Sequence, residues 1–177
     1  MILYHGSSIP DIDALHPGMA QGDHPCVYLT HSKVLATIYA HNPLTRPNGF
    51  FTYWWSKDGQ LFYDEYFENQ LEEIYSGQTG YVYECEGNFP AMDKMPWVYL
   101  AEHPVPILAR TQIPDLYTQL LQYEQDGLLT VRRWHQVSQK QKDLWKNVVR
   151  NSLMKTDRSA PLGMEYEAYI KTHFQNI

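Results

Sequence analysis

A histidine, a glycine and two tyrosines near the N-terminus have the types and spacing of a ligand site. His5 and Gly6 end a short apolar run that begins at Ile2. Gly6 lets the backbone turn and lets a ligand approach closely, because glycine has no Cβ. Tyr28 lies in a second apolar run, and Tyr39 follows it eleven residues later. We therefore expect a cleft that both phenol rings can face.

The second run and the residues after it must form the elements that hold the two tyrosines. Residues 26–29 are apolar, aromatic or β-branched, as is typical of a short buried strand. Thr30 or Ser32 can then cap a helix, because a side-chain hydroxyl there accepts a hydrogen bond from the first turn. The apolar positions of that helix are Val34, Leu35, Ile38 and Tyr39. The pattern predicts a strand followed by a helix that folds back over the sheet.

These stretches resemble a known family. The matching residues are Tyr4-His5-Gly6-Ser7, Val27-Tyr28-Leu29-Thr30 and residues 36–40. They resemble the His-Tyr-Glu branch of the ADP-ribosyltransferase superfamily, which includes the poly(ADP-ribose) polymerases, diphtheria toxin and the RNA 2'-phosphotransferases. The resemblance is confined to the first 40 of the 177 residues. It implies that NAD is bound as a substrate.

The resemblance also implies a role for each matching residue. His5 is expected to hydrogen-bond a ribose hydroxyl of NAD, and Gly6 with Ser7 to hold the nicotinamide amide. Tyr28 is expected below the floor of the cleft, and Tyr39 is expected to stack on the nicotinamide ring. A histidine at a strand end can equally be a core residue that the backbone satisfies, and a tyrosine can simply be core. No metal is expected, because the spacing of His16, His24 and Cys26 fits no closed metal motif.

The family also has a catalytic glutamate at the head of a late strand. Breaking the nicotinamide glycosidic bond passes through an oxocarbenium-like state, which a nearby carboxylate stabilises. The corresponding strand here is residues 96–100, where the glutamate position falls on Pro96 or Trp97. The acids nearest in the sequence are Glu84, Glu86 and Glu102. We take Glu84 and Glu86 as the catalytic candidates, although in an alternating strand such residues usually face solvent.

Two functions follow. The first is an NAD-binding, ADP-ribosyltransferase-like protein that transfers one ADP-ribose to an acceptor, since chain elongation is not expected without the family glutamate. The alternative is a catalytically inactive nucleotide-binding or protein/nucleic-acid interaction module on the same fold. An RNA phosphotransferase is disfavoured, because residues 1–110 carry only 5 Lys and Arg against 13 Asp and Glu.

Charge is distributed unevenly along the chain. The net charge of −6 divides into −8 over residues 1–110 and +2 over residues 111–177. Residues 131–158 hold eight Lys and Arg against two Asp. This basic segment is the candidate contact for a protein or nucleic-acid acceptor. The other interpretation is the solvated side of an amphipathic helix, because Lys142, Lys146 and Arg150 have i, i+4 spacing.

The remaining chain predicts an α+β domain with a split antiparallel sheet, flanking helices and a helical C-terminal extension. Residues 50–55 and 60–63 form an aromatic hairpin around Asp58-Gly59, which either stacks a ligand base or packs on the core. Strands are expected at residues 80–87, 97–100, 105–108 and 128–134. Helices are expected at residues 65–75, from Thr111 or Pro114 to Glu124, at 137–152 and at 163–174.

Length and composition favour one domain, residues 1–177, with a core at 1–112 that contains the NAD-type cleft and an extension at 113–177. Two cysteines, Cys26 and Cys85, are typical of a reduced, intracellular protein. No leader is evident at the N-terminus, and no apolar run approaches the roughly 18 residues that span a bilayer. We therefore expect a cytoplasmic protein without a membrane partner.

Overall fold

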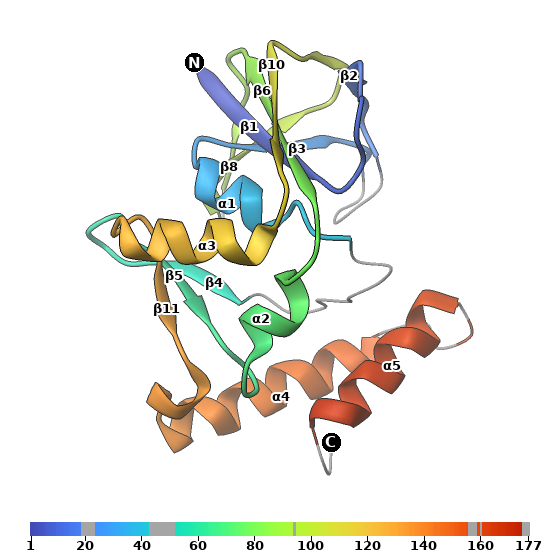
Figure 1. The fold of residues 1–177 in the computed structure, drawn as a ribbon. Coiled ribbons are helices and arrows are strands. Elements are labelled where there is room, and N and C mark those ends of the chain that lie inside the picture. Colours follow the sequence, from blue (N-terminus) through green and yellow to red (C-terminus); the bar gives the residue numbers. More distant parts are fainter. Residues whose placement is uncertain (19–23, 43–51, 94, 156–158, 160, 175–177) are drawn as a thin grey trace. The chain divides into compact units, whose positions relative to one another are not determined.

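The computed structural model describes residues 1–18, 24–42, 52–93, 95–155, 159 and 161–174 (Figure 1). The described chain is mixed α+β, with a mostly antiparallel sheet and five α-helices. Its contacts group into two compact units. Unit 1 is Met1–Asn42 with Gly77–Leu120, and unit 2 is Pro43–Ser76 with Leu121–Ile177.

Unit 1 is built on a six-stranded sheet in the order β10-β6-β1-β3-β8-β7. Its neighbouring strands pair antiparallel throughout. The strands are β1 (Ile2–Ser7), β3 (Val27–Thr30), β6 (Gly80–Glu86), β7 (Ala91–Met92), β8 (Met95–Ala101) and β10 (Ala109–Ile113). A separate pair joins β2 (Ala14–Leu15) to β9 (Val105–Pro106). The predicted N-terminal strand and the strand at residue 27 are therefore confirmed as neighbours in one sheet.

Helix α1 (Lys33–Ile38) packs against strand β1 of this sheet (Figure 1). Ser32 is its N-cap, because the Ser32 hydroxyl accepts a hydrogen bond from the amide of Leu35 at 3.2 Å. A Cβ added to Gly6 would lie 1.8 Å from the carbonyl oxygen of Ala36. A Cβ added to Gly80 would lie 3.0 Å from the carbonyl oxygen of Ala40. Glycines on two adjacent strands thus allow the helix backbone to approach the sheet closely.

The other face of the sheet carries an apolar core. Its buried residues are Leu3, Leu15, Val27, Leu29, Cys85, Ala101 and Val105. They come from six strands of unit 1, so this core joins the main sheet to the β2–β9 pair. Burial of these side chains is the main favourable term that holds unit 1 together.

Unit 2 holds a smaller sheet, in the order β11-β5-β4. The expected hairpin is confirmed as β4 (Tyr53–Trp55) and β5 (Leu61–Asp64), with the connecting Gly59 at φ 82°. Strand β11 (Thr130–Arg132) pairs parallel to β5. The helices are α2 (Gln70–Tyr75), the 3-10 helix η1 (Trp134–Gln136), α4 (Gln139–Lys155) and α5 (Pro161–His173). Helix α3 (Leu116–Gln125) passes from unit 1 into unit 2.

An aromatic core holds the helices of unit 2. It contains Tyr66, Phe67, Val137, Trp145, Val149, Leu153, Tyr166, Ile170 and Phe174. The ring of Tyr66 stacks on Trp145 with centroids 4.6 Å apart, and Phe67 packs edge-on against Phe174. Much of the high aromatic content therefore fills the interior of this unit. Among the described residues, no helix has both the length and the apolar character needed to cross a bilayer.

Three element predictions fail for identifiable reasons. The helix expected from Glu65 begins only at Gln70, because the Glu65 amide bonds the Arg132 carbonyl like a strand residue and Asn69 takes a left-handed φ of 61°. The helix expected from Thr111 or Pro114 begins at Leu116, because Thr111 lies in strand β10, whose residues before Ile113 are exposed and show no alternation that would predict a strand. Tyr39 caps α1 and is 46% exposed, so it does not belong to the apolar face of that helix.

Candidate functional site

The structure brings His5 next to the strand that carries Tyr28. Strands β1 and β3 are neighbours and register at Tyr4 opposite Thr30. Beyond that pair, Nδ1 of His5 lies 2.9 Å from the carbonyl oxygen of Tyr28. The imidazole therefore joins the two strands by a side-chain contact, just where their pairing ends.

This contact fixes the tautomer of His5. A carbonyl oxygen only accepts hydrogen bonds, so Nδ1 must carry the proton that is donated to Tyr28. Burial lowers the pKa of the His5 imidazole below its ordinary value of 6.5, and the hydrogen bond to the Tyr28 carbonyl raises it by less. The ring is therefore neutral at pH 7, and its Nε2 has a lone pair that can accept a hydrogen bond from a hydroxyl.

Gly6 and Ser7 follow on the same strand. The space in front of the Gly6 Cα is filled by the carbonyl of Ala36, so close helix packing by itself explains the glycine there. The Ser7 hydroxyl accepts a hydrogen bond from the amide of Ile9 at 3.1 Å and so turns the chain after β1. Both residues lie at the end of β1 that is near His5.

The two tyrosines lie at opposite ends of the β3–α1 unit. Tyr28 is half-buried on β3, and Tyr39 ends α1 with 46% of its surface exposed. Side chains alternate between the faces of a sheet. The Tyr28 side chain therefore projects from the face of the sheet opposite to that of Val27 and Leu29. The His5 side chain projects from the same face as Leu3, and Leu3 belongs to the same core as Val27 and Leu29. His5 thus meets Tyr28 through the backbone, while the Tyr28 ring lies on the face that α1 covers.

The acidic candidates differ in position along β6. Glu84 is half-buried and lies opposite Tyr4, one residue from the partner of His5. Glu86 is exposed and lies opposite Ile2, four residues from the level of Gly6, which is about 13 Å along a strand. Of the two, Glu84 is the closer to His5 along the sheet, but it lies on the face of Tyr4, opposite to the face of the His5 side chain.

The strand expected to carry the family glutamate is β8, which pairs with β3 and places Val98 opposite Thr30. Pro96 is exposed and Trp97 is half-buried. The nearby Glu102 follows the end of β8 and is exposed. No carboxylate therefore comes from the predicted position. Among the described residues, no group of three or more His, Cys, Asp or Glu could hold a metal ion.

A second candidate site lies in unit 2, where the sequence pointed only to an aromatic hairpin and a basic segment. A cavity of about 450 Å³ is lined by Tyr53, Trp54, Asp64, Tyr66, Arg132, Gln141 and Trp145. Trp54 comes from the hairpin and Arg132 from the basic segment. Phe50 and Phe51 of the expected aromatic set lie outside the described residues. The parallel pairing of β11 with β5 brings the hairpin and the basic segment together. No local pattern in the sequence predicts that pairing.

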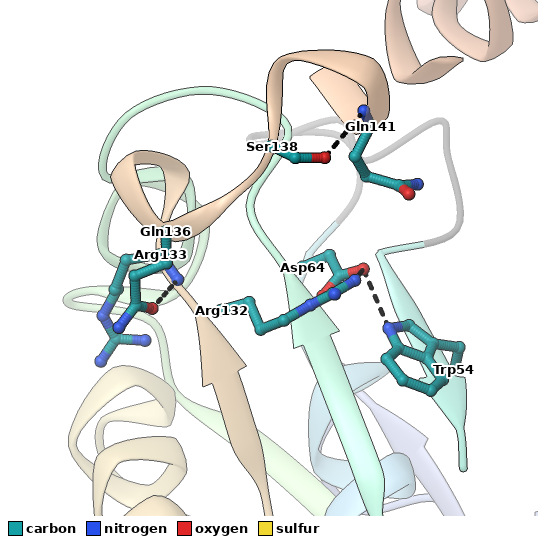
Figure 2. Close-up of polar contacts among 7 residues, drawn as sticks. All are labelled: Trp54, Asp64, Arg132, Arg133, Gln136, Ser138 and Gln141. Atoms are coloured by element: carbon teal, nitrogen blue, oxygen red, sulfur yellow. Dashed lines mark hydrogen bonds and ion pairs between the residues drawn. The ribbon is translucent and has the colours of Figure 1, made fainter. Parts of the chain in front are cut away.

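An ion pair forms the polar wall of this cavity (Figure 2). Arg132 and Asp64 are opposite residues on β11 and β5, so their side chains share one face. Nε of Arg132 donates to Oδ1 of Asp64 at 2.5 Å, and Nη2 donates to Oδ2. The indole Nε1 of Trp54 donates to the same Oδ2 at 2.9 Å. The hydrogen bond with Asp64 raises the pKa of the Arg132 guanidinium, which therefore stays charged.

The basic segment at residues 131–158 is only partly available to a partner. Arg132 is paired with Asp64, Arg133 forms an ion pair with Glu124 at 2.7 Å, and Lys142 lies 4.2 Å from the ring centre of Trp134. The exposed cations on α4 are Lys140, Lys146, Arg150 and Lys155. Arg158 lies outside the described residues. The exposed cations follow the solvated side of α4, as the i, i+4 spacing indicated.

Comparison with known proteins finds no relative of this chain. Scans against protein-family models, curated proteins and solved structures match nothing. The site must therefore be interpreted from its own chemistry.

Proposed function

We propose that the chain binds NAD in an ADP-ribosyltransferase-like cleft and transfers one ADP-ribose to an acceptor. The observation that carries this proposal is the hydrogen bond between His5 Nδ1 and the Tyr28 carbonyl. It holds a neutral imidazole between β1 and β3, with Nε2 able to accept from a ribose hydroxyl. The N-terminal resemblance to the superfamily supports the same assignment.

Each residue then has a physical task. Tyr39, exposed at the end of α1, can stack on the nicotinamide ring. Of the two glutamates, Glu84 is the candidate to stabilise positive charge that develops on the ribose, because it lies on the face of the sheet that carries Tyr28 and is closer than Glu86 to the level of Gly6; the His5 side chain lies on the other face. Glu86 is assigned no catalytic role, since it lies toward the opposite end of β1.

One observation favours the second candidate, an inactive nucleotide-binding module. The family's glutamate position falls on Pro96 or Trp97, and neither residue can stabilise a cation by charge. Glu84 must therefore replace it from another strand. Binding and chemistry are separable on this basis, and each has its own experiment.

Binding is tested by calorimetric titration of NAD and nicotinamide into the wild type and Tyr39→Ala. Loss of a stacked ring should cost about 0.5 to 1.5 kcal/mol, which is roughly a two- to tenfold increase in Kd. The control is Tyr123→Ala, because Tyr123 lies half-buried on α3, away from the β1–β3 pair in the chain. Equal affinity of Tyr39→Ala and the wild type, or no binding by either protein, would refute the pocket.

Chemistry is tested by incubation with NAD labelled in the ADP-ribose part. We expect release of nicotinamide or self-modification that is lost in Glu84→Gln and kept in Glu86→Gln. The two substitutions are matched, because both glutamates lie on β6, two residues apart, and so project from the same face of the sheet. Binding without turnover in the wild type would select the inactive module. Equal turnover in both variants would remove Glu84 from the mechanism.

The protonation state of His5 gives a pH prediction. Because burial lowers its pKa below 6.5, the folded protein keeps a neutral imidazole at pH values where a free histidine is already charged. NAD affinity should therefore stay level from pH 8 down to about 6.5 and fall only below that value. Titrations across this range check the result. A decline centred at 6.5 or above would contradict the assigned state.

The same pKa has a consequence for stability. Below about pH 6.5 the unfolded chain binds a proton at His5 that the folded chain does not, so the free energy of unfolding falls as the pH falls. Burial also lowers the pKa of His41, which acts in the same direction. A His5→Gln variant should show a weaker decline in stability between pH 6.5 and 5 than the wild type.

A further inference from the structure

The cavity of unit 2 has a size and a wall structure that suit a single flat ring system. Its volume of about 450 Å³ falls in the lower part of the range of small-molecule sites. Trp145 stacks on Tyr66 at an interplanar angle of 9°, and Trp54 stacks on Phe62, also at 9°. Three of the four lining rings, those of Trp54, Tyr66 and Trp145, are thus fixed in orientation by a stacked ring. The guanidinium of Arg132 also lies 5.1 Å from the ring centre of Trp54. Two rigid aromatic surfaces favour a planar ligand that stacks on them.

The charges in the cavity balance. Asp64 is almost fully buried, and its side chain receives hydrogen bonds from Arg132 and Trp54. A bound cation would be repelled by Arg132, and a bound anion would face the carboxylate of Asp64. The polar wall therefore favours an uncharged ring over either ion.

The unused hydrogen-bond donors point to a particular edge of such a ring. The Arg132 side chain donates Nε–H and one hydrogen of Nη2 to Asp64, and this side chain makes no further hydrogen bond with any described residue. The remaining Nη1 and Nη2 hydrogens form a parallel pair at the tip of the guanidinium, and 38% of this side chain is exposed. A parallel donor pair binds two acceptors on one edge. Among the nucleobases, guanine presents O6 and N7 in this arrangement.

Gln141 adds a further polar side chain to the lining of the cavity. Its backbone amide is bonded to the Ser138 hydroxyl at 3.3 Å, which fixes the first turn of α4 (Figure 2). The side-chain amide makes no hydrogen bond with the described residues. It offers one donor group and one acceptor to a ligand.

We propose that this cavity binds a guanine base, with the tip of Arg132 on O6 and N7 and the ring stacked on the aromatic wall. The base can come from a free guanine nucleotide or from a guanine in a single-stranded nucleic acid. Adenine fits less well, because its N6 amino group is a donor and would face a donor of Arg132. The site lies within unit 2 and is independent of the NAD site proposed in unit 1.

The first test is calorimetry on the full chain with four probes. Guanosine 5'-monophosphate should bind, while 7-deazaguanosine 5'-monophosphate and adenosine 5'-monophosphate should bind at least about tenfold more weakly, because each loses one acceptor. Ribose 5-phosphate lacks the base and should not bind. Equal binding of all four probes would show a phosphate site and overturn the proposal, as would no binding of the guanine nucleotide either alone or within an oligonucleotide.

Two matched arginine variants locate the site. Arg132→Lys keeps the positive charge but loses the parallel donor pair, so guanosine 5'-monophosphate should bind about tenfold more weakly. Arg133→Lys is the control, since Arg133 is also paired with a carboxylate but lies away from the cavity (Figure 2). Weakened binding in Arg133→Lys with unchanged binding in Arg132→Lys would overturn the assignment.

A second variant tests the same cavity with a substitution that should not affect folding. Gln141→Ala removes a side chain that holds no described neighbour, so the protein should fold as the wild type does and lose a few-fold in guanine affinity. NAD binding should be unchanged in Arg132→Lys and in Gln141→Ala. Unaltered guanine affinity in Gln141→Ala together with Arg132→Lys would exclude the cavity.

The source of the base is settled by an oligonucleotide. A single-stranded decamer of adenines with one central guanine is compared with the all-adenine decamer and with the free nucleotide. Tighter binding of the guanine-containing strand than of the nucleotide identifies a nucleic-acid ligand. Tighter binding of the nucleotide identifies a small-molecule ligand. Equal binding of the two decamers, without binding of the nucleotide, would overturn the proposal.

Discussion

Replacing Gly6 by alanine should lower the free energy of unfolding by about 3 kcal/mol. The added methyl carbon would lie 1.8 Å from the Ala36 carbonyl oxygen, 2.8 Å from its carbon and 3.0 Å from the Ala40 amide nitrogen. All three are backbone atoms of the α1 segment, so no side chain can rotate away. The helix must instead shift from the sheet, which loses packing across β1 and β6. We expect the melting temperature to fall by roughly 6 to 12 °C.

Urea unfolding followed by far-ultraviolet circular dichroism measures this effect. Gly18→Ala is the matched control, because a Cβ at Gly18 meets nothing within 4 Å, and its stability should change by less than about 0.5 kcal/mol. Similar losses in the two variants would mean that α1 does not press on Gly6. Wild-type stability of Gly6→Ala with loss of NAD binding would show that this glycine serves a ligand and not the helix.

Replacing Glu65 by alanine should cost about 3 kcal/mol, for a different reason. The Glu65 carboxylate is 3% exposed and accepts hydrogen bonds from two backbone amides, those of Leu71 at 3.1 Å and Trp134 at 3.0 Å. It thereby joins the end of β5 to α2 and η1. Its removal leaves two amides without partners, and each buried unsatisfied donor costs about 1 to 3 kcal/mol.

The same urea experiment tests this prediction with two companions. Glu65→Gln keeps one acceptor oxygen but turns an amino group toward the other amide, so it should lose about half as much. Glu68→Ala is the surface control, because Glu68 is exposed on the following loop and should be neutral within about 0.5 kcal/mol. An equal response of Glu65→Ala and Glu68→Ala would show that the carboxylate does not hold these elements together.

The neighbouring acids Asp64 and Glu65 illustrate how far local patterns reach. Glu65 was expected to begin a helix and Asp64 directly follows the expected hairpin, and both are buried. Asp64 ends β5 and pairs with Arg132, while Glu65 caps two other elements. Arg132 lies 68 residues from Asp64 and Trp134 lies 69 residues from Glu65, so no window of the sequence around the two acids could reveal these contacts; only the Glu65 contact with Leu71 is local.

Helix α4 also shows that local sequence patterns predict an element better than its packing. Its extent and its Ser138 cap follow from the sequence, and the structure confirms both to within a few residues. The apolar stripe that its sequence predicts consists of Leu144, Trp145, Val148 and Val149. Of these, Trp145 and Val149 are buried, whereas Leu144 is 54% and Val148 37% exposed. Periodicity defines an apolar stripe, but the aromatic core of unit 2 decides which edge of the stripe is covered.

The sequence by itself determined the elements whose signals are local. These are the β1 and β3 strands with the capped α1 helix, the hairpin around Gly59 and the helices with clear apolar periods, because caps, turns and alternation act over a few residues. The tertiary structure alone decided what lies beside what. It placed His5 on the Tyr28 carbonyl and Arg132 on Asp64, since strand order and parallel pairing depend on the total burial that the whole chain achieves.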